Sequence, residues 1–134
     1  MLDTNVVSEL VRRKPEKRVV AFVQAQPNAI LSALVLHEIT YGAERVKDPV
    51  LRARLTAWVA SIRTGYAGRI VEVDADIAEQ AGRLRAAAEA GGIVIEAIDA
   101  LIAASAASRG AAVATRNVRD FSALGVGVIN PWDA

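Results

Sequence analysis

The stretch that decides the fold changes within ten residues from a short apolar segment to a helical pattern: Ile30-Leu31-Ser32-Ala33-Leu34-Val35-Leu36-His37-Glu38-Ile39. Ile30 and Leu31 indicate a buried strand. Ser32 favours the start of a helix, because its hydroxyl can accept a hydrogen bond from a free backbone N–H. The apolar residues after Ser32 have helical spacing. A strand that leads directly into a helix is the repeating unit of α/β folds.

The same alternation of short and long apolar segments runs along the whole chain. Strands are expected at residues 1–3, 30–31, 70–73, 112–115 and 126–129. Strands of this kind, separated by helices, predict a mainly parallel sheet of about five strands with helices on both faces. In such sheets ligands bind at the carboxyl ends of the strands.

Capping residues and breakers mark where the helices should begin and end. Thr4 or Asn5, Ser32, Asp48-Pro49 and Asp74 have the side chains of helix starts, and Pro15 suits a first helical position. Gly91-Gly92 should end the helix that follows Asp74. The last long helix should begin at Ile95 and end at Gly110. The segment around residues 115–121 has mixed charge and is expected to be a loop.

Composition narrows the function classes. The chain has 134 residues, of which 53% are hydrophobic, and this length and composition favour one folded domain over residues 1–134. Its formal net charge is +1. It has no cysteine and a single histidine, His37, so disulfides, thiolate catalysis and Cys- or multi-His zinc sites are excluded. No signal peptide or membrane span is visible, and we expect a cytoplasmic protein.

Three acidic residues lie at positions where an unpaired carboxylate costs free energy. Asp3 directly follows the first strand, and Glu38 and Asp99 lie beside the apolar positions of their helices. Each has an ordinary alternative. Asp3 could cap a helix, Glu38 could pair with Arg45, and Asp99 could simply favour the positive end of its helix.

A fourth polar segment follows the strand at 112–115. It brings Thr115, Asn117 and Asp120 toward the carboxyl edge of the sheet, where Asp3 and the other acids should also lie. Clustered carboxylates repel one another unless a cation is present, and a site of oxygen ligands selects Mg²⁺ or Mn²⁺. The sequence therefore predicts a divalent-metal site on one edge of the sheet.

Five segments, in order, resemble the PIN-domain family. They are Leu2–Glu9, Leu31–Gly42, Asp99–Ala104, Ala114–Phe121 and Val128–Trp132, and the last is similar to the FitB-like branch of VapC toxins. The resemblance implies a three-layer α/β/α sandwich. It also implies the toxin of a type II toxin–antitoxin system, an endoribonuclease that requires Mg²⁺ or Mn²⁺.

The resemblance also implies roles for residues and partners. Asp3, Glu38 and Asp99 are the acidic core, and the fourth position is Asn117 or Asp120. The family further implies a homodimer and a cognate antitoxin, which inserts a segment, often with a basic side chain, into the acidic pocket. The chain departs from the family in a first strand two or three residues shorter and in having Glu96 near the third motif.

The expected reaction is hydrolysis of an RNA phosphodiester by a metal-activated water. Asp3 and Asp99 would bind the ion, Glu38 would hold it or orient the water, and Asn117 or Thr115 would position water or phosphate. His37 is expected on the surface or at an interface, not in catalysis.

Positive charge near the acids should contact the RNA backbone. Arg116 and Arg119 flank the fourth motif and are expected to contact phosphates. A second cluster, Arg12 to Arg18, is explained equally well as a solvated face.

The same residues bear on two other classes of function. Phosphoacceptor and phosphatase sites need a late lysine, and all three lysines (14, 17 and 47) precede residue 48. The serious alternative is a PIN-like module that binds RNA or a protein without cleaving it. Apolar Trp58, Val59 and Ile62 exceed the needs of one small core and also favour a dimer. No motif identifies the RNA target.

Overall fold

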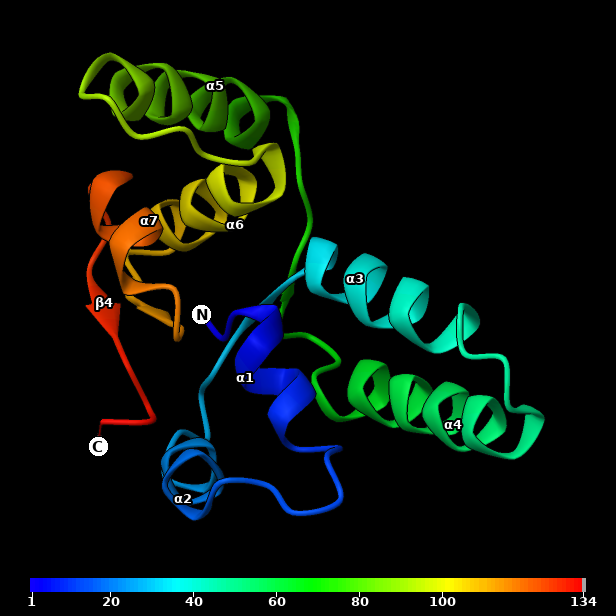
Figure 1. Ribbon diagram of the computed structural model, residues 1–134. Helices are drawn as coiled ribbons and strands as arrows, with labels where there is room; N and C mark the ends of the chain where they lie inside the picture. Colours follow the sequence, from blue (N-terminus) through cyan, green and yellow to red (C-terminus); the bar gives the residue numbers. More distant parts are fainter. Residues whose placement is uncertain (134) are drawn as a thin grey trace.

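The computed structural model describes residues 1–133, and helices make up most of it (Figure 1). In chain order the elements are α1 (Thr4–Glu9), α2 (Lys17–Gln24), β1 (Leu31–Ser32), α3 (Ala33–Glu44), α4 (Pro49–Gly65), β2 (Ile70–Val71), α5 (Ala75–Ala90), α6 (Ala97–Ser108), β3 (Val113–Ala114), α7 (Val118–Ala123) and β4 (Val128–Ile129). Figure 1 shows α1 to α4 on one side of the strand segments and α5 to α7 on the other. The expected α/β fold with helices on both faces is confirmed.

The strands are short and parallel, and the N-terminal segment joins them. β1 pairs with β2, and β3 pairs with β4. Residues 1–3 lie between these pairs. The backbone N–H of Leu2 donates to the carbonyl of Ile30 at 3.0 Å, and the backbone N–H of Asp3 donates to the carbonyl of Ala114 at 2.9 Å. The spatial order is therefore β2, β1, residues 1–3, β3 and β4, which agrees with the expected five parallel segments. The central segment is the one that ends in Asp3.

Three of the predicted helix starts are confirmed by the hydrogen bonds of their caps. The side chains of Ser32, Asp48 and Asp74 each accept a backbone N–H from the first turn of α3, α4 and α5, respectively. At α1, however, the cap is Asp3 and not Thr4 or Asn5, because the Asp3 carboxylate accepts the N–H of Thr4 at 2.8 Å.

Two other predicted starts are wrong. Helix α2 begins at Lys17 and not at Pro15, because the buried carboxylate of Glu9 accepts the N–H of Glu16 at 2.9 Å and holds the chain extended there. Helix α6 begins at Ala97, since Ile95 is fully buried in the extended segment that precedes it. The segment expected as a loop contains helix α7, which contributes the fully buried ring of Phe121.

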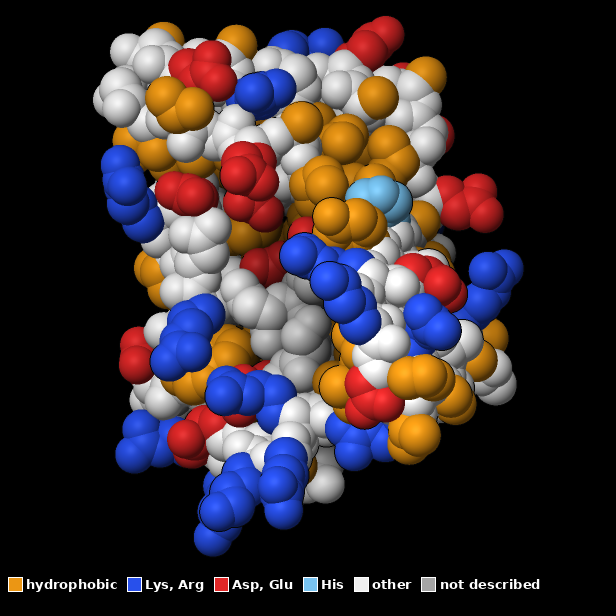
Figure 2. Space-filling view, turned by 45° about the vertical axis from the view of Figure 1, so that its right-hand side comes forward, with side chains coloured by type: hydrophobic (Ala, Val, Ile, Leu, Met, Phe, Trp, Pro, Cys, Tyr) orange, Lys and Arg blue, Asp and Glu red, His pale blue; other side chains and the backbone are white. Residues whose placement is uncertain are grey.

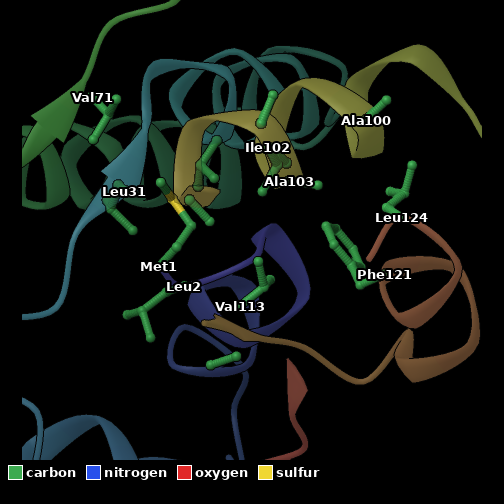
Figure 3. Close-up of a cluster of buried hydrophobic side chains, with 14 of the residues drawn as sticks. Met1, Leu2, Leu31, Val71, Ala100, Ile102, Ala103, Val113, Phe121 and Leu124 are labelled. Carbon is green, nitrogen blue, oxygen red and sulfur yellow. The ribbon is translucent and has the colours of Figure 1, made fainter. Parts of the chain in front are cut away.

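The core lies where the strand segments meet the helices. Figure 3 shows Leu31 and Val113, from two strands, in one cluster with Ile102 of α6 and Phe121 of α7. These four side chains are fully buried. Their packing fixes the ends of the strands, which carry the polar residues described next. No helix within residues 1–133 is long and apolar enough to cross a membrane.

Candidate active site

Asp3 lies at the carboxyl end of the central strand segment and is only 5% exposed. Its carboxylate accepts hydrogen bonds from Thr4 N at 2.8 Å, Asn5 Nδ2 at 3.0 Å and Thr115 Oγ1 at 2.7 Å. Burial raises the pKa of Asp3, and these three hydrogen bonds act in the opposite direction because they stabilise the anion. Asp3 is thus both a helix cap and a buried acid that residues from the first and fourth segments contact.

Glu38 projects from α3 toward the start of α1 and is half-buried. Its Oε1 accepts a hydrogen bond from the hydroxyl of Thr4 at 2.5 Å. The alternative pairing with Arg45 is wrong, because the Arg45 guanidinium lies over the ring of Tyr41, 5.4 Å from its centroid. Within residues 1–133 Glu38 forms no salt bridge, and its negative charge helps to raise the pKa of Asp99.

Asp99 lies in the first turn of α6 and is half-buried. Burial, and after it the negative charges of Asp3, Glu38, Glu96 and Asp120 in that order, together raise its pKa to about 6. The pKa of Asp99 is therefore raised in part by four acids from other positions in the sequence. The fold thus holds the predicted acids close together at one edge of the sheet, against their mutual repulsion.

The fourth segment places an amide between two carboxylates. Asn117, directly before α7, donates from Nδ2 to Oδ2 of Asp120 at 3.0 Å and to Oδ2 of Asp99 at 3.5 Å. The backbone N–H of Asn117 donates to Thr115 Oγ1 at 3.0 Å, and Thr115 is fully buried. Both candidates for the fourth position, Asn117 and Asp120, thus lie beside Asp99, and Asn117 links them.

The two arginines of this segment are exposed, and neither pairs with the acids. The Arg116 guanidinium lies over the ring of Trp132, 4.9 Å from its centroid. Arg119 lies on α7 and forms no salt bridge within residues 1–133. His37 is exposed on α3, as expected, and contacts none of the acids through a hydrogen bond given for the described residues.

Asn5 is the site residue that sequence analysis assigned only to helix capping. Its Nδ2 donates to Asp3 and also to Thr115 Oγ1, at 3.2 Å, while its Oδ1 accepts the backbone N–H of Arg116 at 3.3 Å. Asn5 therefore joins the first and fourth segments. Its signal in the sequence is its place in the run Asp3-Thr4-Asn5, immediately after the central strand.

The donor set fits a hard divalent cation. All its side-chain ligand atoms are carboxylate or amide oxygens, which Mg²⁺ and Mn²⁺ prefer. Burial raises the pKa of Asp99 most, and the negative charge of the neighbouring acids, which a cation would neutralise, raises it as well. Within residues 1–133 no three acidic or imidazole side chains are close enough to enclose an ion alone. The arrangement suits Mg²⁺, which keeps several waters and needs one or two carboxylates.

Comparisons with known proteins agree with this architecture. The PIN domain family model matches residues 1–126. The chain is 34% identical to VapC ribonuclease Y4jK of Sinorhizobium fredii, over 99% of this chain and 97% of the relative. It is 38% identical to toxin FitB of Neisseria gonorrhoeae, over 98% and 97% of the two chains.

A solved structure is similar to this chain in both fold and sequence. The crystal structure of FitAcB from Neisseria gonorrhoeae superimposes with a TM-score of 0.93 at 35% identity, covering 99% of this chain and 98% of that one. With the family model and the full-length relatives, this shows that the chain belongs to the PIN-domain family.

Proposed function

We propose that this chain is a divalent-cation-dependent endoribonuclease and the toxin of a type II toxin–antitoxin system. Relatives named as a VapC ribonuclease and as a toxin match it over nearly its whole length. The observation that carries the proposal is the environment of Asp99, whose pKa rises to about 6 beside four other acids. Such a cluster is costly to the fold and is typical of a site that works with a bound cation.

Asp3 and Asp99 are the residues proposed to hold the cation, with Glu38 and Asp120 completing the negative charge around it. When bound, Mg²⁺ or Mn²⁺ lowers the pKa of water and offsets charge on a phosphoryl group. Thr115 and Asn5 fix the carboxylate of Asp3 and favour its ionised form by donating hydrogen bonds to it. Asn117 holds the carboxylates of Asp99 and Asp120 by its amide.

Two arginines near the acids are proposed to bind the RNA backbone. Arg116 follows the buried Thr115, and Arg119 lies one helical turn further along, on the exposed side of α7. A polyanion approaches an acidic site only if cations beside it offset the repulsion. Both side chains are exposed and unpaired within residues 1–133, so they are free to contact phosphates.

The test is cleavage of structured RNAs by the purified protein with Mn²⁺ or Mg²⁺. We expect cleavage that EDTA abolishes and that Asp3→Asn and Asp99→Asn each reduce by at least a hundredfold, as removing a transition-state interaction does. Glu44→Gln is the matched control, because Glu44 is an exposed acid on the same helix as Glu38. Cleavage that persists in both aspartate variants contradicts the proposal. RNA binding without any cleavage favours the alternative of a binding module.

An antitoxin that covers the acidic site is the proposed partner. The half-buried carboxylates of Glu38 and Asp99 have no cationic partner within residues 1–133. A basic side chain on an inserted segment would supply one. Co-expression with a short reading frame encoded next to this chain should yield an inactive complex, and activity should return when the partner is removed by proteolysis. Undiminished nuclease activity of the complex would exclude inhibition by this route.

We also propose a homodimer. Helix α4 fully buries none of its residues, and Val50 at its start is 79% exposed. Tyr41 on the neighbouring α3 is 60% exposed. Exposed large apolar side chains on neighbouring helices are typical of an interface between subunits. Light scattering at micromolar concentration should give twice the chain mass, and a monomeric mass would refute the dimer.

A further inference from the structure

A cavity of about 410 Å³ lies beside the acidic site, between the loop after α1 and the C-terminal segment. Its walls are lined by basic side chains, one tryptophan and two glutamates: Glu9, Arg12, Lys14, Pro15, Glu16, Lys17, Arg116 and Trp132. We call this set the basic cradle. The cradle joins residues near the start of the chain to residues near its end.

The cradle carries excess positive charge that the protein itself does not neutralise. Of its cations, only Arg12 forms a salt bridge with a described residue, to Glu9 at 3.1 Å. Lys14, Lys17 and Arg116 form none within residues 1–133. Figure 2 shows acidic side chains near the centre of one face of the molecule, with Lys and Arg side chains beside and below them. The unpaired cations of the cradle therefore suit an anionic ligand from outside.

A buried acid fixes the shape of the cradle. Glu9 is 5% exposed, and its carboxylate accepts the backbone N–H of Glu16 at 2.9 Å as well as Arg12 Nη1. These contacts tie both ends of the loop that carries Lys14. The loop is thus held in place before any ligand arrives, which lowers the entropy lost on binding.

The C-terminal segment fixes the opposite wall. The ring of Trp132 lies under the guanidinium of Arg116, and Arg18 Nη1 donates to the carbonyl of Trp132 at 3.2 Å. The backbone N–H of Trp132 donates to Asn130 Oδ1 at 3.1 Å. Trp132 is therefore a positioning residue, which acts by holding Arg116 at the edge of the cradle.

The cradle is continuous with the acidic site through two residues. The backbone N–H of Arg116 donates to Asn5, and Asn5 donates to the buried carboxylate of Asp3. A nucleic-acid strand that passes the acids on this side reaches the cradle next.

From these observations, and on the basis of the proposed ribonuclease function, we propose that the basic cradle binds a backbone phosphate of the RNA strand next to the cleaved bond. Lys14, Lys17 and Arg116 contact the phosphate, and Trp132 positions Arg116. Contacts of this kind set the register of the strand and not its sequence preference. The cradle would therefore favour longer RNA substrates over very short ones.

The test separates binding from cleavage. Asp99→Asn protein in EDTA is titrated with a short, labelled single-stranded RNA of mixed sequence, and the affinity is measured by fluorescence anisotropy over a range of salt. Adding Lys14→Gln and Lys17→Gln should weaken binding about tenfold. It should also make the slope of log K against log salt shallower by up to about 0.7, since one phosphate contact on a single strand contributes about that much.

The control replaces two exposed cations outside the cradle, Lys47 in the loop between α3 and α4 and Arg54 on α4. The combined variant Lys47→Gln with Arg54→Gln should leave the slope unchanged. Trp132→Leu should weaken binding and reduce the slope, whereas Trp132→Phe should restore both, because a phenyl ring also stacks on arginine. An unchanged slope in the double lysine variant overturns the proposal. So does an effect confined to duplex DNA, or an equal effect in the control pair.

The result is independent of the nuclease assignment. Loss of binding in the lysine variants of a protein that never cleaves RNA supports the cradle and contradicts the proposed function. If the protein cleaves RNA but the double lysine variant leaves the slope of log K against log salt unchanged, the result supports the function and contradicts the cradle. In the active protein, the lysine variants should raise KM for long RNA and leave kcat nearly unchanged, the sign of lost uniform binding.

Discussion

The hydroxyl of Thr115 donates a 2.7 Å hydrogen bond to Oδ2 of Asp3, which joins residues 112 positions apart at the ends of neighbouring strand segments. Both side chains are buried, Thr115 completely and Asp3 to all but 5%. A buried carboxylate is tolerated only when its oxygens have donors. The position of the acid and the stability of the sheet therefore depend on the same contact.

Replacing Thr115 by valine removes this donor and keeps the shape of the side chain. We expect the free energy of unfolding to fall by about 2 kcal/mol, since a hydrogen bond to a charged group contributes about that much. Urea denaturation measures the change. Thr115→Ser should recover most of the loss, and Thr56→Val, at an exposed position of α4, should cost little. A neutral Thr115→Val would show that the contact does not stabilise Asp3.

Replacing Asp99 by asparagine should abolish cleavage and yet stabilise the fold. Its carboxylate is repelled by four other acids and has a pKa of about 6. Because Asp99 is only half-buried, solvent screening reduces the gain to roughly 1 kcal/mol at neutral pH. Urea denaturation in EDTA should show the gain. Mn²⁺ should then stabilise the original protein more than the variant, because only the former binds it well. A less stable variant in EDTA would contradict the repulsion.

The pH dependence of stability follows from the same group. The pKa of Asp99 is about 6 in the folded protein and near its usual value of 3.8 in the unfolded chain. The folded state therefore holds the proton more tightly, and the contribution of Asp99 to stability falls as pH rises from about 4 to about 6. The stability advantage of Asp99→Asn should be absent below pH 4 and should reach its full value above pH 6. A constant difference across this range would show that Asp99 does not titrate as described.

Cleavage should depend on pH in the opposite sense. A protonated Asp99 cannot hold a divalent cation, so the rate should rise with pH as this carboxyl ionises, in the region below and around its pKa of about 6. Raising Mn²⁺ should move this rise to lower pH, because cation and proton compete for one carboxylate. The rate measured from pH 5 to 8 at two Mn²⁺ concentrations tests this. If the rise in rate occurs at the same pH at both Mn²⁺ concentrations, a group other than Asp99 controls it.

Asn117 should act through the two carboxylates that it links. Asn117→Ala removes the amide from Asp99 and Asp120, and we expect apparent Mn²⁺ affinity and activity to fall about tenfold or more, as for other groups that orient metal ligands. Asn28→Ala, an exposed asparagine remote from the acids, is the control. Asn117→Asp adds a charge beside Asp99 and should shift the rise of activity to higher pH. Unchanged Mn²⁺ dependence in Asn117→Ala would assign the fourth position to Asp120 alone.

The order of the elements and the three central acids could be predicted from sequence, because both are local patterns. Ser32, Asp48 and Asp74 precede helical periods and cap their helices as expected. Glu38 and Asp99 stand out because they interrupt apolar spacing. Such signals need no knowledge of distant contacts.

The errors arose where a distant residue decides the local structure. Helix α2 starts after Pro15 because Glu9 holds the N–H of Glu16, and nothing in the local pattern indicates that contact. Helix α7 is expected to be a loop because charged residues stand among Val118, Phe121 and Leu124, and the apolar spacing of these three residues is too short to stand out. The pairing of Glu38 with Arg45 failed because the ring of Tyr41 offers that guanidinium another site.

The central place of residues 1–3 in the sheet has a consequence for synthesis. Translation produces this segment first, yet one of its two neighbours is β3, which ends at Ala114. Contacts that far apart in sequence form late, because a long loop must close before they contribute. A ribosome-bound chain that lacks β3 has no neighbour on that side of Asp3, and no Thr115 to donate to it. The acids therefore assemble into one site only when the chain is nearly complete, so an unfinished chain has no complete site with which to perform the proposed cleavage.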